Sequence, residues 1–312
     1  MRDSISNSEG RTKSQWQWGK GEGPLSLISV QTRQGSCSSF VHVRSRQPFN
    51  GARMDVKGGG KEEKTSVMAE AGRVLITFDV DGTLIQSLGL NSNLLHKKAF
   101  SYAMEEVFGI VGTIDAIKHH GSTDPMVLVN TLEHYGIPLD QATVRLHDLK
   151  EKMLDYTREN ASQIKEGLEL LPGVEDLLAA LAERKKDVVI GLVTGNLEEI
   201  AWLKMEGLGI RKYFSTPNFG GFGSDHSDRG ELVKIATQRA EAYHPGEFSL
   251  KVHVGDTPND IRAAEYGGAL ALGVCTGVFS RDDLLAASEN GNVIILEDLK
   301  DSWIFFKACN IT

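Results

Sequence analysis

The chain has 312 residues, of which 40% are hydrophobic, and a formal net charge of −8. The length suits one large domain or a core with a second module, and the acidic balance excludes the basic face of a nucleic-acid-binding protein. No apolar run approaches the roughly 20 residues that cross a bilayer, so we expect no membrane partner.

The first 54 residues differ in charge from the rest of the chain. They contain eight Lys and Arg, three Asp and Glu, and ten serines, with no periodicity that could bury one face. We therefore predict that residues 1–72 are a disordered extension. A Ser- and Arg-rich, acid-poor start is typical of organelle transit peptides, and a plain flexible tail is the alternative.

The three cysteines lie far apart in sequence and have neither metal-binding spacing nor a disulfide pattern, which indicates a reducing compartment. We expect an intracellular, soluble protein. Its place would be a chloroplast or mitochondrion if the extension is a transit peptide, and otherwise the cytoplasm.

An apolar run over residues 73–80 predicts a buried strand. Two carboxylates, Asp79 and Asp81, stand at its end, and Gly82 then turns the chain away. Paired carboxylates can bind Mg²⁺ through oxygen, supply a nucleophile, or divide acid and base roles between them. This strand end is therefore the first candidate for chemistry.

A helical segment follows the first strand. About a hundred residues separate this strand from the next, whereas a crossover needs only about a dozen. Helical patterns cover residues 94–107 and 125–134, and apolar residues from Ala142 to Tyr156 recur every three or four positions. We predict an inserted helical module over residues 86–168.

The sequence "HHGSTDP" lies between the first two of these helical patterns. Ser122, Thr123 and Asp124 within it are candidates for substrate contact. A simple N-cap for the following helix is the alternative.

The second half of the chain alternates strands with helices. Alternation of this kind predicts a parallel sheet with helices on both faces, and near-continuous apolar strands fit burial on both sides. We expect strands over residues 187–194, 250–255, 270–275 and 293–296, and helices over 197–207, 230–243, 258–266 and 281–288.

Two of these strands end in polar residues that complement the first pair of acids. "VTGN" places Thr194 after one strand, and "GDTPND" places Asp256 and Asp260 after another. Ligands of open α/β sheets bind beyond the carboxyl ends of the strands. Asp256 could complete a cation site there, and Thr194 with neighbouring N–H groups could hold phosphate oxygens.

The motifs "DVDGTL", "VTGN" and "GDTPND", in this order on strand ends, resemble the haloacid dehalogenase-like hydrolase superfamily. The helical insert, with "LPGV" before the second strand, resembles its phosphoglycolate phosphatase-like and β-phosphoglucomutase-like group. The resemblance implies an α/β fold in which a Rossmann-like parallel sheet core, residues 73–85 and 169–312, carries a helical cap of residues 86–168.

The resemblance also implies a role for each matching residue. Asp79 would attack phosphorus and become an aspartyl phosphate, while Asp81 would protonate the leaving oxygen and then activate water. Mg²⁺ would be held by Asp79, by the backbone carbonyl of Asp81 and by Asp256, with Asp260 as a helper behind them. The phosphate-binding residues would be Thr194, Gly195 and Asn196.

One position departs from the family pattern. The family has a lysine at the start of the helix before the last acidic motif, and here "SDRGELVKIA" has Arg229. Arginine also neutralises phosphate and can bind it bidentately, so we favour Arg229 as the cation of the phosphate site. Lys204 is the alternative, because some branches of the family place the lysine earlier.

The second acid selects among the reactions of the family. Asp81 indicates phosphate esters, because an alkoxide leaving group needs a proton. We expect a Mg²⁺-dependent phosphatase for a small phosphorylated metabolite, either a phosphoglycolate-like compound or a sugar phosphate. A phosphomutase of the β-phosphoglucomutase type and a catalytically inactive scaffold are the alternatives. The sequence does not indicate an oligomeric state.

Overall fold

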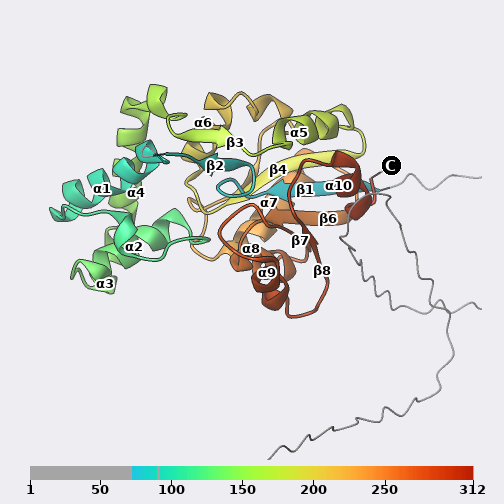
Figure 1. The fold of residues 1–312 in the computed structure, drawn as a ribbon. Helices are drawn as coiled ribbons and strands as arrows, with labels where there is room; N and C mark the ends of the chain where they lie inside the picture. The colour runs from blue at the N-terminus through green and yellow to red at the C-terminus, as the bar shows by residue number, and fades with distance from the viewer. Residues whose placement is uncertain (1–71, 90–91, 312) are drawn as a thin grey trace, which may run out of the picture. The chain divides into compact units, whose positions relative to one another are not determined.

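The computed structural model describes residues 72–89 and 92–311. Within them a parallel sheet has the strand order β5-β4-β1-β6-β7-β8 (Figure 1). The predicted α/β fold with a parallel sheet is thereby confirmed. The strands are β1 (Arg73–Phe78), β4 (Val188–Thr194), β5 (Gly220–Phe222), β6 (Phe248–Gly255), β7 (Leu270–Val274) and β8 (Val293–Leu296).

Helices cover both faces of the sheet. Successive residues of a buried strand point to opposite sides, so one strand can pack against both helical layers. Ile76 and Phe78 of β1 lie in an apolar cluster with α5, α6 and α10, whereas Leu75 packs with Ala240 of α7. Burying one such side chain contributes ~1.5–3 kcal/mol, so both layers stabilise the central strand. The helices of the core are α5 (Val174–Glu183), α6 (Glu198–Gly207), α7 (Arg229–Tyr243), α8 (Pro258–Tyr266), α9 (Arg281–Ala287) and α10 (Ser302–Ala308).

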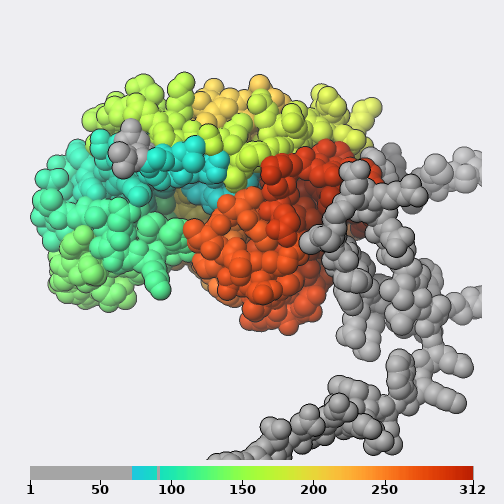
Figure 2. All heavy atoms as spheres, in the orientation of Figure 1, coloured from blue at the N-terminus to red at the C-terminus, as the bar shows by residue number. Residues whose placement is uncertain are grey.

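The segment between β2 (Ile85–Ser87) and β3 (Leu168–Leu170), an antiparallel pair, is helical. We call residues 86–168 the cap segment, and its division from the core stays a prediction. Its buried side chains form one cluster that continues onto Ile200 of α6. On the face drawn in Figure 2, the blue-green cap segment lies beside the orange second half of the core. The cap helices are α1 (Leu94–Phe108), α2 (Asp124–His134), α3 (Leu139–Val144) and α4 (Leu146–Glu159).

The apolar stripe from Ala142 to Tyr156 spans two helices in place of one. The helix is interrupted at Arg145, which has a ψ of 10° and stands between the end of α3 and the start of α4. Ala142, Leu149 and Met153 are nevertheless fully buried in the cap cluster. The periodicity therefore predicted the buried side of this region correctly and missed its bend.

The predicted disordered extension, residues 1–72, lies outside the described residues except for its last position. In the described part of the chain, no helix has the length and apolar character needed to span a bilayer.

Candidate active site

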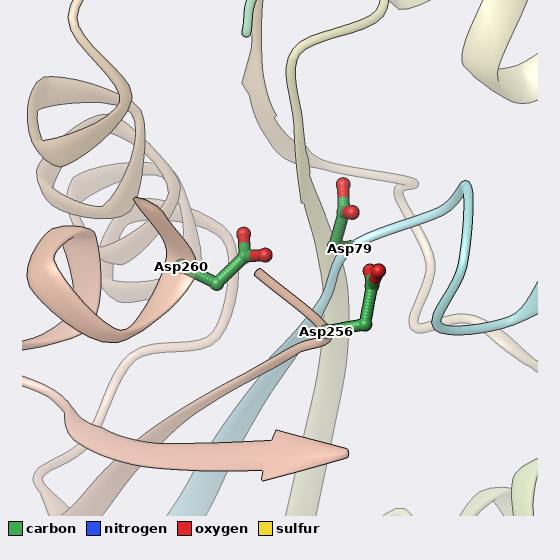
Figure 3. A group of neighbouring side chains, drawn as sticks. All are labelled: Asp79, Asp256 and Asp260. Atoms are coloured by element: carbon green, nitrogen blue, oxygen red, sulfur yellow. The ribbon is translucent and has the colours of Figure 1, made fainter. Parts of the chain in front are cut away.

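Three carboxylates meet at the carboxyl edge of the sheet (Figure 3). Asp79 follows β1, Asp256 follows β6, and Asp260 comes from the first turn of α8. One oxygen from each lies within 4.8 Å of the others, and all three residues are buried. The structure thus brings together three acids that the sequence placed on the ends of separate elements.

Burial makes two acids of this cluster, Asp79 and Asp256, hold protons tightly. Burial, together with the nearby Asp260, raises the pKa of Asp79 to about 6 despite the opposing effect of Arg229. Burial raises the pKa of Asp256 well above its ordinary value, and the charges of Asp79 and Asp260 add to this effect. Anionic carboxylates this close repel one another, so a bound cation would relieve the strain.

Glycines let the neighbouring chain approach Asp256 closely. Gly82, with φ of +91°, would place an added Cβ 2.4 Å from the Asp256 Oδ2 atom, and Gly277 would place one 1.8 Å from it. The Thr83 hydroxyl donates to the other oxygen, Oδ1, at 3.0 Å. The "DGT" turn after the first strand therefore shapes the pocket of a carboxylate 173 residues away.

Asp260 is held by protein donors on both of its oxygens. Its Oδ2 accepts from the backbone N–H of Thr257 at 3.0 Å and from the Thr257 hydroxyl at 2.7 Å. Its Oδ1 lies 2.7 Å from the Arg229 Nε and 3.3 Å from the His253 Nε2. These donors outweigh burial and hold the pKa of Asp260 far below its usual range. Asp260 is therefore placed to act through its partners.

Arg229 is buried between two of the acids. Its Nη2 lies 2.6 Å from the Asp79 Oδ1, and its Nε lies 2.7 Å from the Asp260 Oδ1. The contact with Asp79 has the distance of an ion pair, although no residue in the described part of the chain gives Nη2 an aligned hydrogen-bond partner. Although burial opposes its charge, the surrounding carboxylates raise the pKa of the guanidinium, so it stays protonated.

Lys204 is also fully buried, but it pairs with the other acid of the first motif. Its Nζ lies 2.9 and 2.8 Å from the two carboxylate oxygens of Asp81 and donates to the Asn196 Oδ1 at 2.7 Å. Burial acts to raise the pKa of Asp81, but Lys204 and His96 outweigh it and lower that pKa. Asp81 keeps 34% of its side chain exposed, so it faces open space.

The two candidate cations therefore occupy different places. Arg229 lies against Asp79, and Lys204 lies against Asp81. From the sequence we consider these residues alternatives for one position, and the assignment of Arg229 to the phosphate stays a prediction.

The "VTGN" turn is buried at the end of β4. The Thr194 hydroxyl accepts from the Asn196 backbone N–H at 3.4 Å. The Asn196 side chain donates to the Asp81 Oδ2 at 2.9 Å while its carbonyl accepts from Lys204, so both of its ends are paired. The predicted phosphate contact of this turn thus depends on Thr194 and on backbone N–H groups.

Ser122, Thr123 and Asp124, the candidate substrate contacts, form a loop at the start of α2 that we call the cap loop, and it contacts the core directly. Asp124 accepts from the Leu197 backbone N–H at 2.8 Å, and its Oδ2 lies 3.0 Å from the His96 Nε2. Thr123 stands at the N-cap position of α2 without making a side-chain cap, and it donates to the Ser227 carbonyl at 3.1 Å. The simple N-cap alternative thus lacks its hydrogen bond, and contact of Ser122, Thr123 and Asp124 with substrate stays a prediction.

Gly195 of the "VTGN" turn contacts the cap loop, and a substitution of Gly195 tests that contact. Its carbonyl accepts from the Asp124 N–H at 2.7 Å, and an added Cβ would lie 2.3 Å from the Ser122 carbonyl oxygen. We expect Gly195→Ala to displace the loop and lower kcat/KM at least ~10-fold, since small misplacements are costly in catalysis.

A steady-state assay, combined with proteolysis of the loop, measures this effect. Gly209→Ala is the control, because its added Cβ meets nothing within 4 Å while its φ of +75° strains the backbone. It should lower stability and leave kcat/KM unchanged. Equal losses of kcat/KM in both variants would contradict a specific role for the loop contact.

A cavity of about 780 Å³ opens beside the acidic cluster. Arg229 contributes to it together with the cap loop, the start of α7 and the face of α8 that carries Asn259, Arg262 and Tyr266. Asp79, Asp81 and Asp256 do not line it. Arg229 is therefore a lining residue of the cavity that also contacts two of the acids, Asp79 and Asp260.

Sequence reasoning missed two histidines near the site. His96 of α1 lies 3.3 Å from the Lys204 Nζ, and His253 of β6 lies beneath Asp260. A histidine inside an apolar strand, as in "LKVHVG", was the available signal for the second. Nothing in the local pattern marked the first.

Comparison with known proteins gives the following relationships. The sequence matches the haloacid dehalogenase-like hydrolases over residues 74–268. A phosphoglycolate phosphatase of Shigella dysenteriae is 27% identical over 212 residues, covering 65% of this chain and 81% of that protein. Pyrophosphatase PpaX of Oceanobacillus iheyensis is 26% identical over 227 residues, covering 72% and 93%. The crystal structure of a hydrolase from Pseudomonas syringae aligns with a TM-score of 0.51 at 19% identity, covering 76% and 99%.

The matched range includes all three strand-end motifs and the cap segment. The structural similarity to the Pseudomonas syringae hydrolase supports the same fold. The resemblance inferred from the motifs is thereby confirmed: the chain belongs to the haloacid dehalogenase-like hydrolase family and is an enzyme, a hydrolase.

Proposed function

We propose that this hydrolase is a Mg²⁺-dependent phosphatase for a small phosphate monoester and that Asp79 forms an aspartyl phosphate in its reaction. The observation that carries the proposal is the meeting of Asp79, Asp256 and Arg229 at one strand edge, with Asp81 on the next turn. Relatives named as phosphatases support it.

The acids of the site suit Mg²⁺, which prefers oxygen ligands and needs few of them from protein. Asp79 and Asp256 hold protons tightly because they are buried together, and a divalent cation would stabilise their ionised carboxylates. Asp260 is already saturated by protein donors. We therefore propose Asp79 and Asp256 as ligands, with Asp260 behind them, and the family resemblance adds the backbone carbonyl of Asp81. Bound Mg²⁺ would offset negative charge on the phosphoryl group and the nucleophile.

The residues of the chain divide the remaining steps. An oxygen of Asp79 would form the bond to phosphorus as the bond to the leaving oxygen breaks. The Thr194 hydroxyl and the N–H groups of its turn would hold the phosphoryl oxygens, and Arg229 would offset their charge. Asp81 would give its proton to the leaving oxygen. It would later take a proton from a water molecule whose oxygen bonds to phosphorus as the Asp79–phosphorus bond breaks, which releases phosphate and restores Asp79.

The low pKa of Asp81 in this structure sets a condition on that acid role. Lys204 and His96 keep the carboxylate ionised, whereas an acid must carry a proton. A phosphate dianion bound beside Asp81 would raise the pKa again, because like charges favour the protonated form. Protonation would thus accompany substrate binding.

The proposed substrate class rests on the names of the relatives. Phosphoglycolate, named by one relative, and sugar phosphates are the first monoesters to test, and pyrophosphate, an anhydride named by another relative, is assayed beside them. A phosphomutase would instead need a bisphosphate for turnover, and an inactive scaffold would release no phosphate from any compound.

A panel of these compounds, assayed with and without Mg²⁺, tests the proposal. We expect phosphate release only with the metal. Millimolar Mg²⁺ should also raise the melting temperature, because a cation that binds the folded acids and not the unfolded chain stabilises the fold. Metal-independent release, or no release from any compound, would reject the proposed function, and an unchanged melting curve would reject the assigned metal ligands.

A further inference from the structure

A polar pair lies within the sheet, beneath the proposed site. His253 of β6 stands opposite Thr77 of β1 in the parallel register, two residues before Asp79. The His253 side chain is fully buried and Thr77 is 3% exposed, next to the buried apolar residues Ile76, Val252 and Val254 of the same strands. Buried polar groups of this kind destabilise a fold unless they are hydrogen-bonded, so their partners indicate what keeps them there.

His253 reaches the acidic cluster through its ring. The Nδ1 lies 3.2 Å from the Thr77 hydroxyl, and the Nε2 lies 3.3 Å from the Asp260 Oδ1. The Asp260 carboxylate can only accept when ionised, so the Nε2 carries the proton in this contact. The ring therefore donates to the same oxygen of Asp260 that binds the Arg229 Nε.

The shared oxygen links His253 to the proposed nucleophile. Arg229 joins Asp260 to Asp79, with 2.7 Å on one side and 2.6 Å on the other. Asp260 has little freedom of its own, since Gly255 lies so close that an added Cβ would be 2.2 Å from the Asp260 Cγ. The position of the guanidinium against Asp79 thus depends on how Asp260 is held from below.

We propose that His253 is a positioning residue of the reaction, because it fixes the Asp260 oxygen that sets Arg229 against Asp79. The proposal rests on the proposed function for its kinetic consequence, while the contact itself is independent of the substrate. His253 does not touch the reacting atoms, and it acts through two side chains.

Two substitutions separate positioning from packing. His253→Met keeps a similar volume and loses the donor, whereas His253→Gln retains an amide N–H of comparable reach. We expect His253→Met to lower kcat ~10-fold with little change in KM, in the range found for supporting partners of catalytic ligands, and His253→Gln to recover most of it. Thr131→Val is the control, since this buried cap hydroxyl donates only to its own helix. It should lower stability without changing kcat.

A double-mutant cycle with Arg229→Met tests the route. If His253 acts through Arg229, His253→Met should change kcat less than ~2-fold once Arg229 is Met. The same ~10-fold loss in both backgrounds, or a Gln variant as slow as the Met variant, would overturn the proposal.

The unmodified protein, His253→Met, Arg229→Met and the double variant are also compared by urea unfolding, which needs no substrate. We expect the effect of the double substitution on the unfolding equilibrium constant to depart at least ~3-fold from the product of the single effects. A double-variant effect equal to the product of the two single effects on the unfolding equilibrium constant would overturn the proposed contact, even if Arg229→Met has no measurable activity. Absence of phosphate release by the unmodified protein would instead refute the proposed function and leave this unfolding comparison decisive for His253.

Discussion

Replacing Asp79 with Asn is expected to reduce phosphate release at least ~10³-fold, because the amide cannot form the aspartyl phosphate and loss of a nucleophile removes most of the rate enhancement. The change is nearly isosteric, so the pocket should keep its shape. Phosphate release from the best substrate of the panel, at saturating Mg²⁺, measures the effect.

Asp282→Asn is the matched control, since Asp282 is exposed on α9 and should leave activity unchanged. Asp79→Asn should also raise the melting temperature in metal-free buffer at pH 7. The folded-state pKa of Asp79 is about 6 against an ordinary value of 3.8, so its ionisation costs stability as the pH rises through this window. Activity that survives the substitution would exclude Asp79 as the nucleophile.

Lys204→Met and Arg229→Met are expected to damage the reaction in different ways. Lys204 binds both carboxylate oxygens of Asp81, so its loss should misplace the proposed proton donor and slow an alkyl phosphate by ~10²-fold, even though Asp81 would then take up a proton more easily. The same variant should slow p-nitrophenyl phosphate at least ~10-fold less, because that leaving group needs no proton. Arg229 lies against Asp79, so its loss should slow both esters equally.

The ratio of rates on the two esters is the decisive measurement, since it cancels any loss of folded protein. Lys234→Met and Arg281→Met, at solvent-exposed ion pairs, are the controls for removal of a positive charge. Identical ratios in Lys204→Met and Arg229→Met would contradict the separate places that the structure gives these two cations.

The sequence predicted that Asp79 and Asp256 meet at one edge of the sheet, because both acids stand directly after strands, and their catalytic roles stay a prediction. Asp79, Thr194 and Asp256 each follow an apolar run, and parallel strands bring such ends to one edge without any knowledge of the helices. The family assignment rests on the same three segments and is confirmed.

The partner of each cation was beyond the reach of sequence reasoning. Lys204 lies in the last turn of α6, and Arg229 is the first residue of α7. Which acid each cation contacts depends on distances of 2.6 to 2.9 Å that the packing of these helices sets. His96 was missed for the same reason, because its contact with Lys204 joins the cap segment to the core.

Short elements were also missed. The strand β5 is only Gly220–Phe222, and glycines carry little strand propensity, so tertiary pairing with β4 determines it. The strands β2 and β3 are equally short and were not predicted.

The last helix, α10, carries a practical consequence for anyone preparing fragments of this enzyme. Phe305 of α10 stacks on Phe78 with ring centroids 6.0 Å apart, and Phe78 is the residue immediately before Asp79. The recognised family range ends at residue 268, short of both β7 and this helix. A fragment trimmed to that range would therefore lose the aromatic packing behind Asp79, and β6 would become an unpaired edge strand that is prone to aggregation.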